Sequence, residues 1–268
     1  MLIAEWLDSA STLFIRAGIA TARLDAEIIL AHTLRKSRTW LHAHDDENLS
    51  PRLIEIANAR LDLRLDRTPI AYIIGHKEFY TRTFKVTPSV LIPRPESEAI
   101  IDLLKKHTPV NAKRLIDVGT GSGCLGITAK LELPALSVTL ADISRHALKI
   151  AESNAATLHA EATFVQSDLL AQAPGLFDVV IANLPYVDKS WERSPETDQE
   201  PSLALFADNN GLALIEQLLW TLPEVLNPSA LVLLEADPSQ HKAIISLGAK
   251  LSLKHVETEG YAIALIKS

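Results

Sequence analysis

The stretch "RLIDVGTGSGCLG", residues 114–126, decides how the second half of this chain folds. Its first five residues are mostly apolar and predict a buried strand, and "CLGITAKLEL", which begins at Cys124, predicts a helix. Between them, Gly119, Gly121 and Gly123 allow the backbone to approach a ligand where side chains would collide. The N–H groups at the start of the helix face that ligand. The sequence therefore predicts a strand, a ligand-binding loop and a helix in direct succession.

Strands and helices continue to alternate after this loop. Further strands are predicted for "SVTLAD", "ATFVQSD", "FDVVIAN", "ALVLLEA", "KLSLKHVE" and "YAIALIKS", and "SRHALKIAESNAATL" predicts another helix. Such alternation predicts an α/β fold with a mostly parallel, Rossmann-like sheet that carries helices on both faces. Ligands of these sheets bind beyond the carboxyl ends of the strands. We therefore expect the polar residues that end these strands to share one rim with the glycine loop: Asp117, Asp142, Asp168 and Asn183.

Two cofactor classes compete for this rim. Gly121, Gly123 and Gly126 match the G-x-G-x-x-G pattern of dinucleotide-binding folds. Asp142 follows about 20 residues later, where such folds place a ribose-binding acid, and this favours a nicotinamide or flavin enzyme. Asp117, however, lies beside the expected pyrophosphate, which a carboxylate would repel. A carboxylate suits S-adenosylmethionine (SAM) better, because SAM carries a positive sulfonium and an ammonium group but no phosphate.

The SAM hypothesis gives each acid a role. Asp117 is expected to support the loop and the methionine end of SAM, and Asp142 to accept hydrogen bonds from the ribose hydroxyls. Asp168 either meets the adenine amino group or simply caps the end of its strand. The complete set of predicted cofactor-binding residues is Asp117, Gly119, Thr120, Gly121, Ser122, Gly123, Asp142, Asp168 and Asn183.

The segment "FDVVIANLPYVDKSW", residues 177–191, ends its strand with an amide, a proline and an aromatic ring. Turn propensity alone explains this as a strand stop. The alternative is a binding site for a flat methyl acceptor whose nitrogen lone pair is delocalised. The Asn183 side-chain oxygen and the Leu184 carbonyl would hold the N–H groups of the acceptor. Pro185 would fix the backbone, and Tyr186 would stack on the acceptor. We predict these four residues as the catalytic set, without a metal.

The first part of the chain predicts a separate domain. Residues 1–70 have the apolar spacing of helices, and Ser50-Pro51 resembles the capped start of the third one. Residues 71–92 favour strands and predict a β-hairpin linker. Residues 93–268 then form the α/β domain, whose first helix is expected to begin at Pro95.

Composition limits the class of protein. The chain has 268 residues, 47% of them hydrophobic and 22% charged, with a net charge of -7. A chain of this charge has no broad basic field for phosphate contacts, so direct binding of long nucleic acid is not expected. The single cysteine, Cys124, excludes an internal disulfide. No apolar run is long enough for a bilayer, so a membrane partner is not expected and the cytoplasm is the expected location.

Several motifs together resemble the HemK/PrmC-like family, which methylates the side-chain amide of glutamine in peptide-chain release factors. They are "RLDAEIILAHTL", "PIAYIIGHKEFYTRTFKVTPSVLIPRPESE", "LIDVGTGSGCLGI", "ADISRHALKIAESNA", "FDVVIANLPYV" and "EPSLALFADNNGL". The resemblance implies a helical substrate-recognition domain, a hairpin and a SAM-dependent methyltransferase domain. It also implies a release factor as protein substrate and a glutamine amide held by Asn183 to Tyr186. Glu200 and Pro201 would support that loop.

The chain departs from the family at three places. Leu184 stands where the family motif Asn-Pro-Pro-Tyr has its first proline, and "LLEADPSQ" and "ETEGYAIALIKS" differ from the usual sequences. Asn-Leu-Pro-Tyr also resembles the motif of ribosomal-RNA adenine dimethyltransferases. Two alternatives therefore stay open beside glutamine methylation: an adenine-N6 nucleic-acid methyltransferase and a non-catalytic SAM-binding protein.

Overall fold

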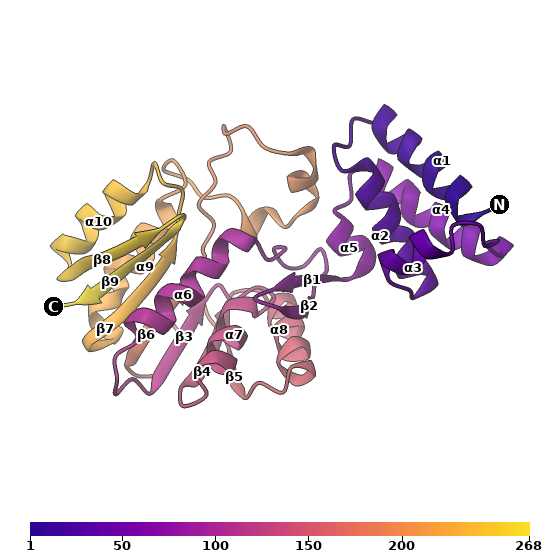
Figure 1. The fold of residues 1–268 in the computed structure, drawn as a ribbon. Coiled ribbons are helices and arrows are strands. Elements are labelled where there is room, and N and C mark those ends of the chain that lie inside the picture. Colours follow the sequence, from indigo (N-terminus) through magenta and orange to yellow (C-terminus); the bar gives the residue numbers. More distant parts are fainter. The chain divides into compact units, whose positions relative to one another are not determined.

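The computed structural model describes residues 1–268, which form two compact units. The helical unit consists of Met1–Gly75 together with Ser194–Gln199, and the sheet unit consists of His76–Arg193 together with Glu200–Ser268. Figure 1 shows most of the helical unit in indigo and violet and the sheet unit in the colours that follow. No helix of either unit has both the length and the apolar composition that a membrane span requires.

Six helical segments build the helical unit. They are α1 (Ile3–Arg16), α2 (Ala22–Leu34), α3 (Arg38–Ala43), α4 (Pro51–Leu65), α5 (Ile70–Ile74) and the 3-10 helix η2 (Pro195–Gln199). Ser50 caps α4 as its sequence predicts, by accepting a hydrogen bond from the backbone N–H of Leu53 at 3.4 Å. Apolar side chains between the helices form a core of their own, which includes Trp6, Phe14 and Leu30.

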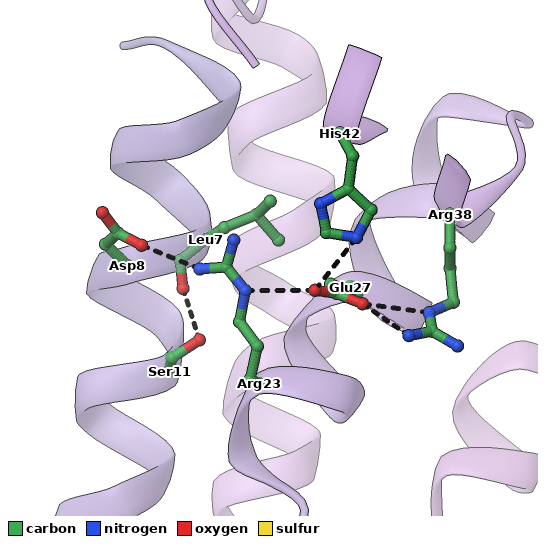
Figure 2. Close-up of polar contacts among 7 residues, drawn as sticks. All are labelled: Leu7, Asp8, Ser11, Arg23, Glu27, Arg38 and His42. Carbon is green, nitrogen blue, oxygen red and sulfur yellow. Dashed lines mark hydrogen bonds and ion pairs between the residues drawn. The ribbon is translucent and has the colours of Figure 1, made fainter. Parts of the chain in front are cut away.

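One buried acid links three of these helices. The Glu27 side chain on α2 is only 5% exposed, and two arginines and a histidine surround it (Figure 2). Arg23 Nε donates to Oε1 at 3.1 Å and Arg38 Nη2 donates to Oε2 at 2.7 Å, while His42 Nε2 lies 3.4 Å from Oε1. Burial raises the pKa of Glu27, but the hydrogen bonds from the two arginines bring it below its ordinary value. Arg23 also donates to Asp8 of α1, so Glu27 connects α2 to α3 directly and to α1 through Arg23.

Charged side chains also bind the segment Ser194–Gln199 within the helical unit. Arg64 of α4 is 7% exposed and lies between two acids. Its Nε donates to Asp25 Oδ2 at 2.7 Å, and its Nη1 donates to Glu196 Oε1 at 3.0 Å. Arg67 donates to the same Glu196 oxygen at 3.3 Å. Burial raises the pKa of Glu196, but hydrogen bonds within its own segment and the charge of Arg64 lower it to about 2.

A seven-stranded sheet is the centre of the sheet unit, and its strand order is β5-β4-β3-β6-β7-β9-β8. The strands are β3 (Arg114–Val118), β4 (Ser137–Asp142), β5 (Ala162–Gln166), β6 (Phe177–Ala182), β7 (Leu226–Glu235), β8 (Leu253–Glu259) and β9 (Ala262–Lys267). The first five are parallel to one another, and β9 pairs antiparallel with both β7 and β8. The predicted α/β class with a mostly parallel sheet is confirmed.

Helices cover both faces of this sheet (Figure 1). Helices α6 (Glu98–His107), α7 (Cys124–Glu132) and α8 (Arg145–Thr157) pack on one face, and α9 (Ala213–Val225) and α10 (His241–Lys250) pack on the other. Successive strand residues alternate between the two cores. In β6, for example, Val179 and Ile181 belong to the first core, whereas Val180 and Ala182 belong to the second. A strand buried on both faces has a continuous apolar run, as in "VVIA", residues 179–182.

Two short strands precede the sheet. Strands β1 (His76–Phe79) and β2 (Arg82–Lys85) form a hairpin inside residues 71–92, the segment expected as a linker, whereas the first residues of that segment, up to Ile74, belong to helix α5. The 3-10 helices η1 (Pro95–Ser97) and η3 (Ser202–Ala204) complete the unit. Pro95 occupies the first position of η1, which runs directly into α6. This turn carries Ser97 toward the end of β6, where it contacts Asn183.

Candidate active site

The site lies where the strand order of the sheet reverses. From β3 the chain proceeds to β4 and β5 on one side, and then returns to place β6 on the other side of β3. Open α/β sheets bind ligands at such a switch point, beyond the carboxyl ends of the two central strands. The glycine loop follows β3 there and Asn183 follows β6. A cavity at this place is lined by ten of the predicted residues: Asp117, Gly119, Thr120, Gly121, Ser122, Asp142, Asp168, Asn183, Leu184 and Pro185.

Asp117 holds the glycine loop from inside. Its side chain is buried, and Oδ2 accepts hydrogen bonds from Thr120 Oγ1 at 2.6 Å and from the Gly126 backbone N–H at 2.9 Å. Burial raises the pKa of Asp117 to about 6, although these two hydrogen bonds oppose the shift. Asp117 therefore anchors the loop from strand β3, and it keeps negative charge next to the cavity at neutral pH.

Asp142 stands one strand further along the rim. Its Oδ2 accepts from the Gly121 N–H at 2.9 Å, and its Oδ1 accepts from the Ser144 N–H at 2.8 Å. Burial raises its pKa, and the hydrogen bonds from backbone N–H groups oppose that shift. Asp142 thus connects the glycine loop to the start of α8 and still lines the cavity. Asp168 also lines the cavity and is exposed to solvent.

Gly123 and Tyr186 are the two predicted site residues that do not line this cavity. A Cβ at Gly123 would lie 2.6 Å from Ile127 Cδ1 and 3.1 Å from Ala151 Cβ, so this glycine serves the packing of α7 against α8. Tyr186 is half-buried and packs against the second core. Its hydroxyl donates to Glu235 Oε1 at 3.1 Å.

The Asn183–Tyr186 loop has polar supports that sequence reasoning missed. Asn183 Nδ2 donates to Ser97 Oγ at 3.1 Å. Gln240 Nε2 donates to the Tyr186 carbonyl at 2.9 Å, and Glu235 accepts from the Tyr186 hydroxyl. Glu235 is the last residue of β7, as Asp142 is the last residue of β4. The strand-end rule, applied to "ALVLLEA", would have placed it on the rim.

Glu200 supports the site from the segment after this loop, as the resemblance implied. Its side chain is 2% exposed, and its Oε2 accepts from the Ile92 N–H at 3.1 Å. Its Oε1 accepts from Arg94, which lines the cavity. The one arginine in the cavity wall is therefore neutralised by a buried acid.

The charges of the cavity wall favour a cationic ligand. Asp117, Asp142 and Asp168 face the cavity, whereas Arg94 is paired. A pyrophosphate would lie next to the buried carboxylates of Asp117 and Asp142. Repulsion between the negative charges would destabilise both the bound pyrophosphate and the ionised carboxylates. A sulfonium and an ammonium group would instead be attracted by the same acids. The donor set therefore fits SAM and does not fit a dinucleotide.

Two protein-family models match the chain. The model of the PrmC N-terminal domain matches residues 5–75, and the model of the methyltransferase small domain matches residues 95–199. The first range covers most of the helical unit. The second includes the glycine loop, the acids of the rim and the Asn183–Tyr186 loop.

Curated relatives match both units together. A release factor glutamine methyltransferase of Koribacter versatilis is 37% identical over 249 residues, which cover 89% of this chain and 89% of the relative. One of Coxiella burnetii is 35% identical over 230 residues and covers 85% of this chain and 83% of the relative. A bifunctional methyltransferase of Rickettsia felis is 30% identical and covers 99% of this chain but only 58% of the longer relative.

Solved structures share the fold at lower sequence identity. A methyltransferase from Pyrococcus furiosus has a TM-score of 0.54 and 19% identity, and the match covers 79% of this chain and 98% of that protein. The 16S rRNA N2 G1207 methyltransferase of T. thermophilus, solved with AdoMet and guanosine, has a TM-score of 0.53 and 15% identity. That match covers 72% of this chain and 49% of the other. These two likenesses concern the fold alone.

Proposed function

The chain belongs to the family of release factor glutamine methyltransferases, and on that premise we propose that it methylates the side-chain amide nitrogen of a glutamine in a release factor. It is a SAM-dependent enzyme. One observation carries the assignment to this site: an acid-lined cavity adjoins the Asn183–Tyr186 loop at the switch point of the sheet. We also propose that the enzyme works in the cytoplasm without direct contact with nucleic acid, which agrees with its net charge of -7.

The reaction is a displacement at carbon. SAM would supply the activated methyl group. Transfer would form a bond between the glutamine nitrogen and the methyl carbon and break the bond between that carbon and sulfur, with its electron pair left on sulfur. The nitrogen would give one proton to water. The chain supplies position and charge: Asp117 and Asp142 shape the loop beside the cavity, and Asn183 and Leu184 line the cavity from the end of the neighbouring strand β6.

Orientation of the amide nitrogen is the main task of the Asn183–Tyr186 loop. An amide is a poor nucleophile because its lone pair is delocalised into the carbonyl. We propose that the Asn183 Oδ1 atom and the Leu184 carbonyl accept its two N–H groups, so that the face of the nitrogen turns toward the methyl group. Asn183 Nδ2 is already engaged with Ser97, which leaves Oδ1 for the substrate. Such positioning lowers the barrier by roughly several kcal/mol without a strong base.

We further propose that the helical unit recognises the release factor. Its helix α4 exposes Ile56 and Leu63, which are 37% and 47% exposed. They are seven residues apart and so lie on one face of the helix. Exposed apolar side chains on one face are typical of protein contact surfaces. Replacing both by glutamate is expected to raise KM for an intact release factor, with KM for a short glutamine peptide unchanged.

The decisive experiment is methyl transfer from labelled SAM to a purified release factor, followed by mass-spectrometric location of the methyl group. We expect the label on the side-chain nitrogen of one glutamine. A SAM-binding protein without catalysis would bind SAM and transfer nothing, and an adenine methyltransferase would label nucleic acid instead. Either result would overturn the proposal.

Two variants of the loop test the mechanism. Asn183→Ala removes an acceptor and should slow single-turnover transfer by about 100-fold, as loss of one preorganised polar group does, while SAM affinity stays nearly the same. Leu184→Pro keeps the backbone carbonyl and should transfer at the original rate or faster. Unchanged transfer by Asn183→Ala would show that the amide-orienting mechanism is wrong. If a folded Leu184→Pro variant transferred no methyl group, the Leu184 side chain and not its carbonyl would make the essential contact. That result would favour adenine methylation.

A further inference from the structure

A buried carboxylate stands behind the predicted catalytic loop. Glu235, the last residue of β7, is 2% exposed, and its Oε1 accepts from the Tyr186 hydroxyl. Its Oε2 atom is buried and lacks a hydrogen-bond partner of ordinary geometry. An acid this deeply buried is costly unless other groups are arranged around it. The proposed reaction, as derived above, gives this carboxylate no role.

Three side chains that carry donors lie beside Glu235: Ser97, Tyr186 and Asn183. The Tyr186 hydroxyl donates to Oε1 at 3.1 Å. Burial raises the pKa of Glu235, and these three neighbours oppose that shift. Asn183 Nδ2 in turn donates to Ser97 Oγ at 3.1 Å, so the serine hydroxyl stands between the amide and the carboxylate. An ionised carboxylate can only accept hydrogen bonds. A group that faces the ionised form must therefore present a donor.

This requirement removes an ambiguity of the Asn183 side chain. An asparagine amide can rotate so that its oxygen and its NH2 group exchange places, and its surroundings decide between the two arrangements. With NH2 toward Ser97 and Glu235, the Oδ1 atom is left for the substrate. The reverse arrangement would set Oδ1 against the carboxylate and would present NH2 to the NH2 group of the substrate glutamine.

We propose that Glu235 is a positioning residue that selects the productive orientation of the Asn183 amide through Ser97. The inference rests on the proposed function, because only an acceptor with N–H groups requires Oδ1 to face the cavity. The segment between β7 and α10, which follows Glu235, also holds the backbone of the Asn183–Tyr186 loop. Gln240 is buried, and its Nε2 donates both to the Tyr186 carbonyl and to the Asn210 carbonyl.

An exchange of donor and acceptor tests this role. Glu235→Gln keeps the size of the side chain but lets the Asn183 amide lie either way, and we expect transfer to slow about tenfold. Asn183→Asp places one carboxylate against another and should slow transfer more than 100-fold. In the variant that carries both changes, the amide at position 235 can donate a hydrogen bond and the carboxylate at position 183 can accept it. Transfer should therefore recover at least tenfold relative to Asn183→Asp alone. Glu224→Gln, at an exposed position on α9, is the matched control and should leave the rate unchanged.

Single-turnover transfer at saturating SAM and thermal unfolding without substrate are measured for all variants. If Glu235 acts on the Asn183 amide, Asn183→Asp should lower Tm less in the Glu235→Gln background than in the original chain. SAM affinity should be similar in all variants. Ser97→Ala, which deletes the intermediate hydroxyl without a change of charge, should slow transfer as Glu235→Gln does.

Two results would overturn the inference while the proposed function stands. One is a Glu235→Gln variant that transfers methyl at the original rate. The other is additivity, with the double variant no faster and no more stable than the two single changes predict. If the unmutated chain transfers no methyl group to a release factor, the proposed function fails, and the positioning role fails with it.

Discussion

Replacement of Gly211 by alanine should displace the predicted catalytic loop while leaving the cofactor cavity intact. Gly211 has a φ of +82°, and a Cβ built on it would lie 1.9 Å from the Tyr186 carbonyl oxygen and 2.6 Å from Gln240 Nε2. Both atoms belong to the hydrogen bond that holds this loop. The nearest obstacle is backbone, so a side-chain rotation cannot relieve the clash.

The size of the effect follows from these distances. A contact of 1.9 Å must open to at least 3.0 Å, so the Tyr186 carbonyl or the Gly211 backbone must move by about 1.1 Å. A misplacement of about 1 Å in a catalytic arrangement can cost roughly 100-fold in rate. The left-handed φ adds about 1–2 kcal/mol of strain for an alanine. We therefore expect Gly211→Ala to be about 100-fold slower and modestly less stable.

Gly260→Ala is the matched control. Gly260 also has a positive φ, +56°, but a Cβ there would meet nothing within 4 Å. Both variants carry the backbone strain, and only Gly211→Ala displaces the loop. Single-turnover transfer, calorimetric SAM affinity and Tm should be compared for the two. If Gly211→Ala transfers methyl at the rate of Gly260→Ala, the position of the Tyr186 carbonyl does not govern catalysis.

Three further predictions concern the acids. Asp142→Ala should weaken SAM binding by roughly 1.5–3 kcal/mol, the value of a hydrogen bond to a charged group, and unchanged affinity by calorimetry would remove Asp142 from the cofactor site. Because burial raises the pKa of Asp117 to about 6, this acid is ionised above that pH and protonated below it. A bound cation favours the ionised form, so SAM binding should release protons near pH 6 and weaken as the pH falls further. Calorimetry in buffers of different ionisation enthalpy detects this release, and buffer-independent heats would contradict it. Glu27→Gln should lower the free energy of unfolding by about 1–2 kcal/mol, because its arginine partners are half-exposed and screened. Urea unfolding measures this loss, and SAM affinity should not change.

Local rules were sufficient for the parts of the site that lie close together in sequence. A strand followed by glycines indicated the glycine loop that lines the cavity, and polar residues near strand ends indicated Asp142 and Asn183, which line the same cavity. Parallel strands end at one edge, so the rule needs no knowledge of strand order. The family resemblance added Glu200, whose contacts with Ile92 and Arg94 agree with a supporting role.

Local rules could not predict which residues distant in sequence would contact each other. Ser97 lies 86 residues before its partner Asn183, and Glu235 lies 49 residues after Tyr186. Nothing in the spacing of either residue indicates the other, because the pairing depends on which strands become neighbours. Gly123 illustrates a second limit: a loop glycine looks the same in sequence whether a ligand or a neighbouring helix approaches it.

The helical unit is discontinuous in the gene, because it takes Ser194–Gln199 from the second half of the chain. Recombination that exchanged only the first 75 codons between two relatives would separate Arg64 and Arg67 from Glu196, the acid that both contact. Loss of that acid leaves Arg64, at 7% exposure, with one partner instead of two. Among homologous sequences, positions 64, 67 and 196 should therefore vary together, and chimeras should fold best when both stretches come from the same parent.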